Sequence, residues 1–154
     1  MDISIIIFLL GGLFLGWSLG ANDAANVFGT AVGTRMVRFK TAAIVCSIFV
    51  ILGAIISGAG TTETLGKLGA INALPGAFAA CVAAGSSVYL MTKAGLPVST
   101  TQAIVGAIVG WNLYTGSTTN VKVLITILGT WILCPVIAGL IAMGFFTLTK
   151  NFIL

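Results

Sequence analysis

The amino-acid sequence predicts an all-α integral membrane protein, a bundle of about five transmembrane helices with broken or re-entrant elements. Of its 154 residues, 58% are hydrophobic and 6% are charged, whereas about 25% of the residues of a soluble domain are charged. The few charges leave five uncharged runs of 20 to 28 residues, at positions 3–22, 41–62, 68–92, 94–121 and 123–149. Because about 20 apolar residues suffice for a helix to cross the hydrocarbon core of a bilayer, each run is a candidate span.

Glycine residues at four-residue spacing indicate that these helices pack against one another. Several of the 20 glycines recur on one helical face: Gly12, Gly16 and Gly20; Gly29 and Gly33; Gly106 and Gly110. Small residues on one face let the backbones of two membrane helices approach closely. We therefore treat residues 1–154 as a single transmembrane domain of packed helices.

The first apolar element, residues 3–37, contains the polar segment 20–26. As one straight helix it would be about 52 Å long at 1.5 Å per residue, so we expect it to be broken or bent at 20–26. It has neither the basic start nor the cleavage site of a secretory signal. The run 41–58 is the next expected span, and segment 59–72, which is rich in Gly and Thr and carries Glu63 and Lys67, is an expected loop.

Prolines and polar residues delimit the later elements. A third span is expected at 73–92, with Pro75 in its first turn, where proline is tolerated. Segment 93–97 then interrupts the helix, and residues 99–102 begin a new helix that covers 103–111. After a turn at 112–120, the last span covers 123–148, and Pro135 predicts a kink in it.

The distribution of basic residues predicts a multi-pass protein of the cell membrane with its N-terminus outside the cytoplasm. If every interruption reverses the chain, one side collects five basic residues and the other two: Arg35, Arg38, Lys40, Lys93 and Lys150, against Lys67 and Lys122. The richer side is cytoplasmic by the positive-inside rule. If segment 93–97 is instead a re-entrant tip, we expect the count after it to invert, which leaves only the first loop as securely cytoplasmic.

Other classes of protein are disfavoured. The net charge of +4 comes from basic residues that flank the spans, which report orientation and not a nucleic-acid partner. The three cysteines lie inside apolar runs without CxxC spacing, and there is no histidine, so we expect neither a soft-metal site nor a resident cofactor. The sparse acids offer no evident catalytic pair, and we do not expect an enzyme.

Asp23 is the first candidate functional residue. It lies between Asn22 and Asn26 in the middle of a long apolar element, and an ionised carboxylate at membrane depth is costly unless it is compensated. Carboxylate and amide oxygens favour a hard cation such as Na+, or a proton. The alternative is an ordinary interfacial turn.

The second candidate is the segment 95–102. Pro97 prevents the preceding helix from continuing, and Ser99 is then a good N-cap for the next one. A helix N-terminus offers free N–H groups and a partial positive charge to an oxyanion such as phosphate or sulfate, and Thr100, Thr101 and Gln102 add neutral donors. The alternative is a simple cap with spare hydroxyl groups.

Together the two segments match the general design of transporters, in which interrupted membrane elements meet at the midplane. A cation held by Asp23 would offset the charge of the anion, so the pattern predicts cation-coupled anion symport. A channel is the second possibility, although it would need a continuous polar stripe. A membrane subunit that does not itself transport is the third.

The same segments resemble the PiT inorganic phosphate transporters. Residues 20–26, GANDAAN, resemble the GANDxAN signature of that family, and residues 97–107, PVSTTQAIVGA, resemble its second motif. The resemblance implies Na+- or H+-coupled phosphate uptake, with sulfate carried by some relatives. It implies cation contacts for Asn22, Asp23, Asn26 and Thr30, with Na+ at Asp23 and Asn22, and phosphate contacts for Asn26, Ser99, Thr100, Thr101 and Gln102.

The chain also departs from that family. Members are about twice as long, with an inverted repeat in which each half supplies one copy of each motif, and this sequence has one copy of each. It resembles the N-terminal half of a transporter, either as part of a longer chain or as a partner of a separate second half. A homodimer of oppositely oriented copies is the remaining possibility. The residues leave phosphate against sulfate, and Na+ against H+, open.

Overall fold

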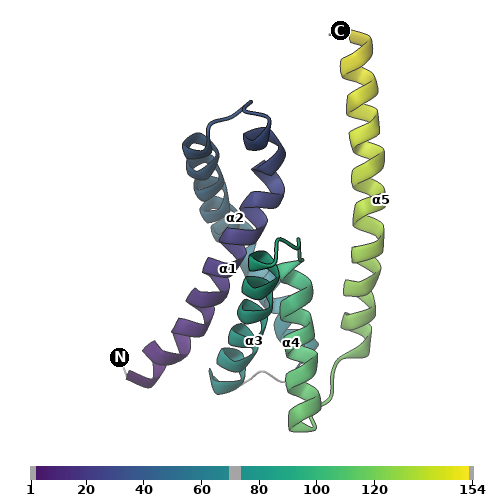
Figure 1. Cartoon of the computed structure of the whole chain (residues 1–154). Helices are drawn as coiled ribbons and strands as arrows, with labels where there is room; N and C mark the ends of the chain where they lie inside the picture. The colour runs from purple at the N-terminus through teal and green to yellow at the C-terminus, as the bar shows by residue number, and fades with distance from the viewer. Residues whose placement is uncertain (1–2, 70–73, 153–154) are drawn as a thin grey trace. The chain divides into compact units, whose positions relative to one another are not determined.

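The computed structural model describes residues 3–69 and 74–152, and every regular element in these ranges is a helix (Figure 1). The five helices are α1 (Ile3–Gly33), α2 (Phe39–Leu68), α3 (Leu74–Lys93), α4 (Thr100–Thr115) and α5 (Val121–Phe152). The predicted all-α class and the number of helices are confirmed. The first four helices form one compact unit, and α5 belongs to a second unit that begins at Asn120.

Four of the helices are long and apolar enough to cross a bilayer: Ile5–Gly33, Phe39–Leu68, Leu74–Lys93 and Val121–Asn151. The exception among the described helices is α4, whose 16 residues span only about 24 Å at 1.5 Å per residue. The structure therefore confirms a multi-pass membrane protein, and it contains one helix too short to cross the ~30 Å core upright.

The expected break in the first element is absent, because α1 runs without interruption from Ile3 to Gly33. Its polar residues do not end the helix, since the side chain of Asn22 finds partners on other segments. A helix of about 46 Å exceeds the bilayer core, but it fits a membrane by tilting or by extending past the core.

The expected loop at 59–72 is wrong for residues 59–68, which continue α2. The hydroxyl groups of Thr62 and Thr64 donate to the carbonyl oxygens of Gly58 and Gly60, four residues earlier. Glu63 also pairs with Lys67 one turn later, with Nζ 2.5 Å from Oε1. These local bonds satisfy the polar groups within the helix, so its Gly- and Thr-rich composition does not end it. Residues 70–73 lie outside the described part of the chain.

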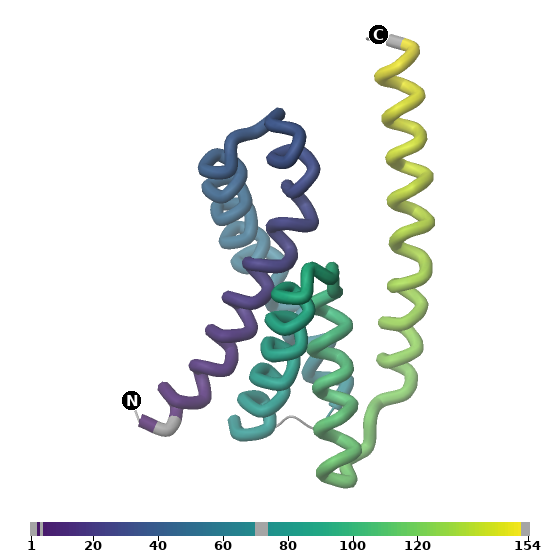
Figure 2. Tube along the Cα trace, viewed as in Figure 1, coloured from purple at the N-terminus to yellow at the C-terminus, as the bar shows by residue number. Residues whose placement is uncertain are grey.

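Close contacts at glycine join α1 and α3, which run parallel (Figure 2). A methyl group on Gly11 would lie 2.8 Å from the ring of Phe78, and one on Gly85 would lie 2.8 Å from the ring of Phe14. Further along the pair, the rings of Trp17 and Tyr89 have centroids 5.5 Å apart. Glycine thus lets aromatic rings of one helix rest on the backbone of the other. These are not the glycines of the predicted four-residue faces, since a Cβ at Gly12, Gly16 or Gly20 would meet nothing within 4 Å.

Helices α3 and α4 form an antiparallel hairpin joined by residues 94–99, hereafter the hairpin tip. Gly76 near the start of α3 packs against the indole of Trp111 near the end of α4. Helix α4 continues beyond the expected residue 111 and ends at Gly116, which adopts the left-handed conformation (φ 69°) common at helix C-termini. The interruption expected at 93–97 is confirmed, one residue later than its predicted start.

The hairpin tip reaches the middle of α1, because Asn22 Nδ2 donates to the carbonyl oxygen of Val98 at 2.6 Å. Asn22 lies roughly 16 Å along the helix axis from the end of α1, where the turn to α2 begins. The same axial distance along α2, measured from its first residue Phe39, leads to Val50. Val50 is close to the centre of the uncharged run 41–62. The tip therefore lies opposite the middle of the apolar segment of α2, which agrees with a re-entrant hairpin.

In the second unit, α5 is a continuous helix through Pro135. Proline has no N–H to donate to the carbonyl group four residues earlier. The residues before and after Pro135 nevertheless keep helical geometry, so Pro135 lies inside α5 and does not end it.

The contact at Gly85 generates a prediction about stability. Gly85→Val is expected to lower the free energy of unfolding by about 1–3 kcal/mol, because the added atoms meet the ring of Phe14 and the backbone of Leu15. Thermal unfolding of the purified chain in detergent measures this. The control is Gly58→Val in α2, where an added Cβ meets open space, and equal melting temperatures for the two variants would contradict the prediction.

Candidate functional site

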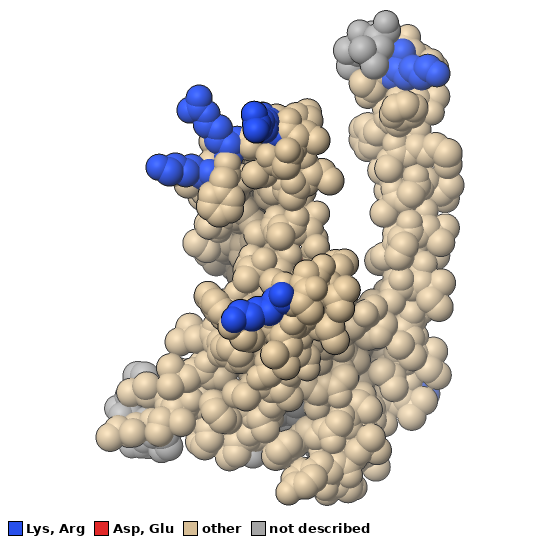
Figure 3. Space-filling model, in the orientation of Figure 1, with Lys and Arg blue, Asp and Glu red and all other residues tan. Residues whose placement is uncertain are grey.

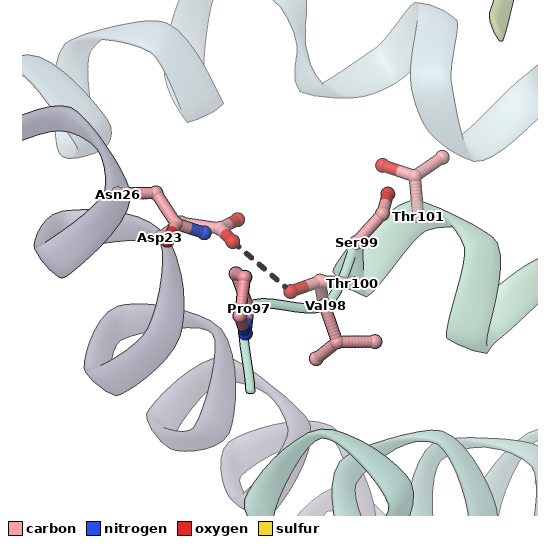
Figure 4. Close-up of a pocket in the computed structure, with 7 residues that line it drawn as sticks. All are labelled: Asp23, Asn26, Pro97, Val98, Ser99, Thr100 and Thr101. Atoms are coloured by element: carbon pink, nitrogen blue, oxygen red, sulfur yellow. Dashed lines mark hydrogen bonds between the residues drawn. The ribbon is translucent and has the colours of Figure 1, made fainter. Parts of the chain in front are cut away.

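A pocket lies where the hairpin tip meets α1 (Figure 4). It has a volume of about 400 Å³, and we refer to it as the tip pocket. Two of its lining residues come from α1 and five from the tip and the first turn of α4: Asp23, Asn26, Pro97, Val98, Ser99, Thr100 and Thr101. The two segments that the sequence marks as chemically important, 74 residues apart between Asp23 and Pro97, therefore form one site.

The N-terminus of α4 faces this pocket. After Pro97 the chain is extended at Ser99 (φ −85°, ψ 117°), and Ser99 Oγ accepts a hydrogen bond from the Gln102 N–H at 3.3 Å. The predicted N-cap is confirmed. The first helical backbone bond runs from the Ala103 N–H to the Ser99 carbonyl, so the N–H groups of Thr100 and Thr101 have no partner among the described residues and are available to a ligand.

Asp23 is held from two sides. Its Oδ1 accepts from Asn22 Nδ2 at 2.9 Å and from Thr100 Oγ1 at 3.3 Å, the bond drawn in Figure 4. Thr100 is buried and Asp23 is half-buried. A carboxylate with two neutral donors on one oxygen keeps its remaining lone pairs for a further ligand.

Asn22 lies behind the pocket and not in its lining. Its side chain is only 3% exposed. Nδ2 donates to Asp23 Oδ1 and to the Val98 carbonyl, and Oδ1 lies 3.3 Å from Thr92 Oγ1 on α3. Asn22 thus connects α1 to α3 and to the hairpin tip.

The structure brings together most of the residues that the sequence singles out, but not all of them. Asp23, Asn26, Ser99, Thr100 and Thr101 line the tip pocket. Gln102 is exposed and contributes its backbone N–H to the cap. Thr30 lies two turns beyond Asp23, about 10 Å further along α1, where its carbonyl oxygen accepts from the Thr34 hydroxyl.

Two groups that bond to Asn22 at this site could not be identified from the sequence. Thr92 ends an apolar run and looks like any threonine whose hydroxyl bonds the carbonyl group four residues earlier, as Thr62 does. The other is the backbone carbonyl of Val98, and a backbone group carries no sequence signal beyond the irregular conformation that Pro97 imposes.

Basic side chains are concentrated at one end of this unit. Figure 3 shows a group of them over the turn between α1 and α2 and the adjoining start of α2; Arg35 and Arg38 lie in this turn, and Lys40 lies in the first turn of α2. The turn between α1 and α2 is the first loop of the sequence.

Comparison with known proteins shows the family to which this chain is similar. The model of the phosphate transporter family matches residues 19–154. A protein of Thermococcus kodakarensis named as a phosphate permease is 36% identical, over 98% of this chain and 40% of its own length. A sodium-dependent phosphate transporter of Plasmodium falciparum is 34% identical, over 92% of this chain and 23% of its own length.

A solved structure of a sodium-dependent phosphate transporter matches with a TM-score of 0.84 and 33% identity, over 98% of this chain and 40% of that chain. This chain therefore spans two fifths or less of the length of these relatives. The resemblance to phosphate transporters read from residues 20–26 and 97–107 is confirmed, and the family comprises transporters and not enzymes. With a family model that covers most of its length, the chain belongs to the phosphate transporter family.

Proposed function

We propose that this chain is one half of a secondary transporter that carries inorganic phosphate across the cell membrane together with Na+. The observation that carries the proposal is the tip pocket, in which a carboxylate at mid-helix faces the free N-terminus of another helix. Anion-binding and cation-binding groups at one site inside a membrane are the requirement for coupling the two ions.

In this proposal the phosphate binds at the N-terminus of α4. The free N–H groups of Thr100 and Thr101 and the hydroxyl groups of Ser99 and Thr101 donate to its oxygens, and the helix dipole favours its charge. Asn26 faces these groups from α1 and adds an amide donor. Gln102 acts through the cap, because its N–H is bound to Ser99 Oγ.

Asp23 holds the cation. Its second oxygen, together with the amide oxygen of Asn26, forms the start of an oxygen cage of the kind that suits a hard cation. A cation here lies between the carboxylate and the phosphate and so offsets their repulsion. Na+ is favoured over H+ because relatives of this chain are named as sodium-dependent. Asn22 and Thr30 belong to the surroundings of this cation, Asn22 directly behind Asp23 and Thr30 further along α1.

A second half completes the site. In this chain the tip pocket is open, and Ser99 and Thr101 are exposed. Added Cβ atoms at Gly12, Gly16 and Gly20 of α1, or at Gly106 and Gly110 of α4, meet open space, and such faces suit close packing of further helices in lipid. We propose that a second transporter half covers these faces, within a longer chain or as a separate one. Two oppositely oriented copies are the alternative.

The N-terminus of α1 is proposed to lie outside the cytoplasm, with the α1–α2 turn inside. A re-entrant hairpin starts and ends on the same side of the membrane, so the start of α5 keeps the side that five full crossings give it. The inversion expected from the sequence alone therefore does not arise. Only Lys93 changes its place, from the cytoplasmic side to the depth of the hairpin tip.

Binding of labelled phosphate to the purified chain tests the proposal. We expect Na+ to strengthen binding relative to choline, and Asp23→Asn to abolish this Na+ effect because the cation loses its charged ligand. The matched control is Glu63→Gln, which removes an acid that is exposed and paired on α2. Na+-dependent binding that survives Asp23→Asn would contradict the assignment of the cation, and equal competition by sulfate would favour a sulfate carrier.

Uptake into proteoliposomes then tests the half-transporter. The chain alone is expected to bind phosphate without transporting it. Na+-driven uptake by the chain alone would instead mean that two copies form the complete transporter. A chain that neither binds nor transports would leave a non-transporting membrane subunit as the better function.

A substitution at Ser99 can distinguish the role of this residue as the N-cap of α4 from its role in the proposed anion site. Ser99→Asp keeps an N-cap of equal quality, so the melting temperature is expected to stay within about 1 °C to 2 °C of wild type. The new carboxylate repels the anion, and phosphate binding is expected to weaken by more than about tenfold. Ser87→Ala, which removes only a bond to the Ala83 carbonyl, is the control. Undiminished phosphate binding by Ser99→Asp would show that the α4 terminus is not the anion site.

A further inference from the structure

The amide of Asn22 has one orientation that satisfies its neighbours. On one side lie the Val98 carbonyl oxygen at 2.6 Å and Asp23 Oδ1 at 2.9 Å, and a carbonyl and an ionised carboxylate only accept hydrogen bonds. The amino group must therefore face them, which turns Oδ1 toward Thr92 Oγ1, 3.3 Å away. With 3% exposure, this side chain has almost no access to bulk water.

The hydroxyl of Thr92 is the donor that faces Asn22 Oδ1 in this orientation. It carries a single proton, and two acceptors are in reach: the Val88 carbonyl oxygen at 2.8 Å and Asn22 Oδ1 at 3.3 Å. A threonine such as Thr62 or Thr126 has only the carbonyl oxygen four residues earlier as its partner. Among the described threonines, Thr92 is thus the one whose hydroxyl group lies within reach of both a carbonyl oxygen of its own helix and the side-chain amide of Asn22 on α1.

The opposite orientation of the amide would have two consequences. It would place Asn22 Oδ1 against two acceptors, Asp23 Oδ1 and the Val98 carbonyl, and lone pairs would face lone pairs. It would also break the 2.6 Å bond that joins the hairpin tip to α1. A donor on the far side of the amide, such as Thr92 Oγ1 at 3.3 Å, therefore adds to the stability of the orientation that holds Asp23 and the tip together.

We propose that Thr92 is a positioning residue for the cation site: its hydroxyl orients the Asn22 amide, and the amide in turn aligns Asp23 with the hairpin tip. Thr92 does not line the tip pocket, so it acts through Asn22 and touches neither ion. The inference rests on the proposed function for its effect on Na+, but the orientation of the amide is independent of that function. Groups that orient a ligand of a metal ion commonly change its affinity by about 10- to 100-fold.

Nuclear magnetic resonance of the 15N-labelled chain tests the orientation directly. The side-chain amide signals of Asn22 are assigned by their loss in Asn22→Ala. In the wild type we expect two distinct protons that exchange slowly with water, because both are bonded and buried. Thr92→Val should merge or broaden them and speed their exchange at least about tenfold, whereas Thr92→Ser should restore the wild-type signals. The control Thr62→Val loses a hydroxyl of the same kind and should leave them unchanged.

The same variants distinguish an effect of Thr92 on the position of Asp23 from an effect on the stability of the whole fold. Thr92→Val is expected to raise the Na+ concentration for half-maximal enhancement of phosphate binding by about tenfold, with Thr92→Ser and Thr62→Val near wild type. Unchanged Asn22 signals in Thr92→Val, or changed signals with unchanged Na+ dependence, would overturn the positioning role. If Thr92→Val does not fold, Thr92→Ala and Thr92→Ser make the same comparison. A wild type without any Na+ effect would refute the proposed cation coupling, while the amide signals would still decide the orientation.

Discussion

The hydrogen bond from Asn22 to the Val98 carbonyl joins the middle of the longest helix of the first unit to the turn of a hairpin. Without it, the Val98 carbonyl would lose this donor, and an unsatisfied backbone group is costly wherever lipid replaces water. Irregular backbone is tolerated there only when protein or a polar cavity covers it. The tip meets both conditions, because Asn22 bonds its carbonyl on one side and the tip pocket opens on the other. The N-terminus of α4 can then be aimed at Asp23.

This arrangement explains how an acid is accommodated in an unbroken helix. Transporters with interrupted helices expose backbone groups where their helices break. Here α1 stays continuous, and the hairpin alone supplies the helix terminus. Asp23 receives neutral donors from Asn22 and Thr100, and among the described residues no basic side chain is paired with it. A buried cationic side chain would compete with any bound cation for the carboxylate, whereas neutral donors leave the second carboxylate oxygen free.

Much of the fold could be predicted from composition, because uncharged runs of 20 to 28 residues have few alternatives to spanning helices. The cap at Ser99 also followed from local rules, since Pro97 ends one helix and a serine two residues later begins the next. The continuity of α1 at 20–26 could not be predicted, because the polar side chain of Asn22 is satisfied by residues more than 65 positions away. For the same reason nothing in the sequence distinguishes Thr92 from other threonines, and the pairing of the two motifs in one pocket needed the structure.

The glycine contacts between α1 and α3 have a mechanical consequence. Aromatic rings seated on Gly11, Gly76 and Gly85 interlock α1 with α3 and α3 with α4, and packed interiors shift between discrete arrangements and do not deform continuously. We therefore expect these helices to move together. The groups that line the tip pocket all lie on α1, the hairpin tip and α4, so the pocket is carried by a single set of packed helices.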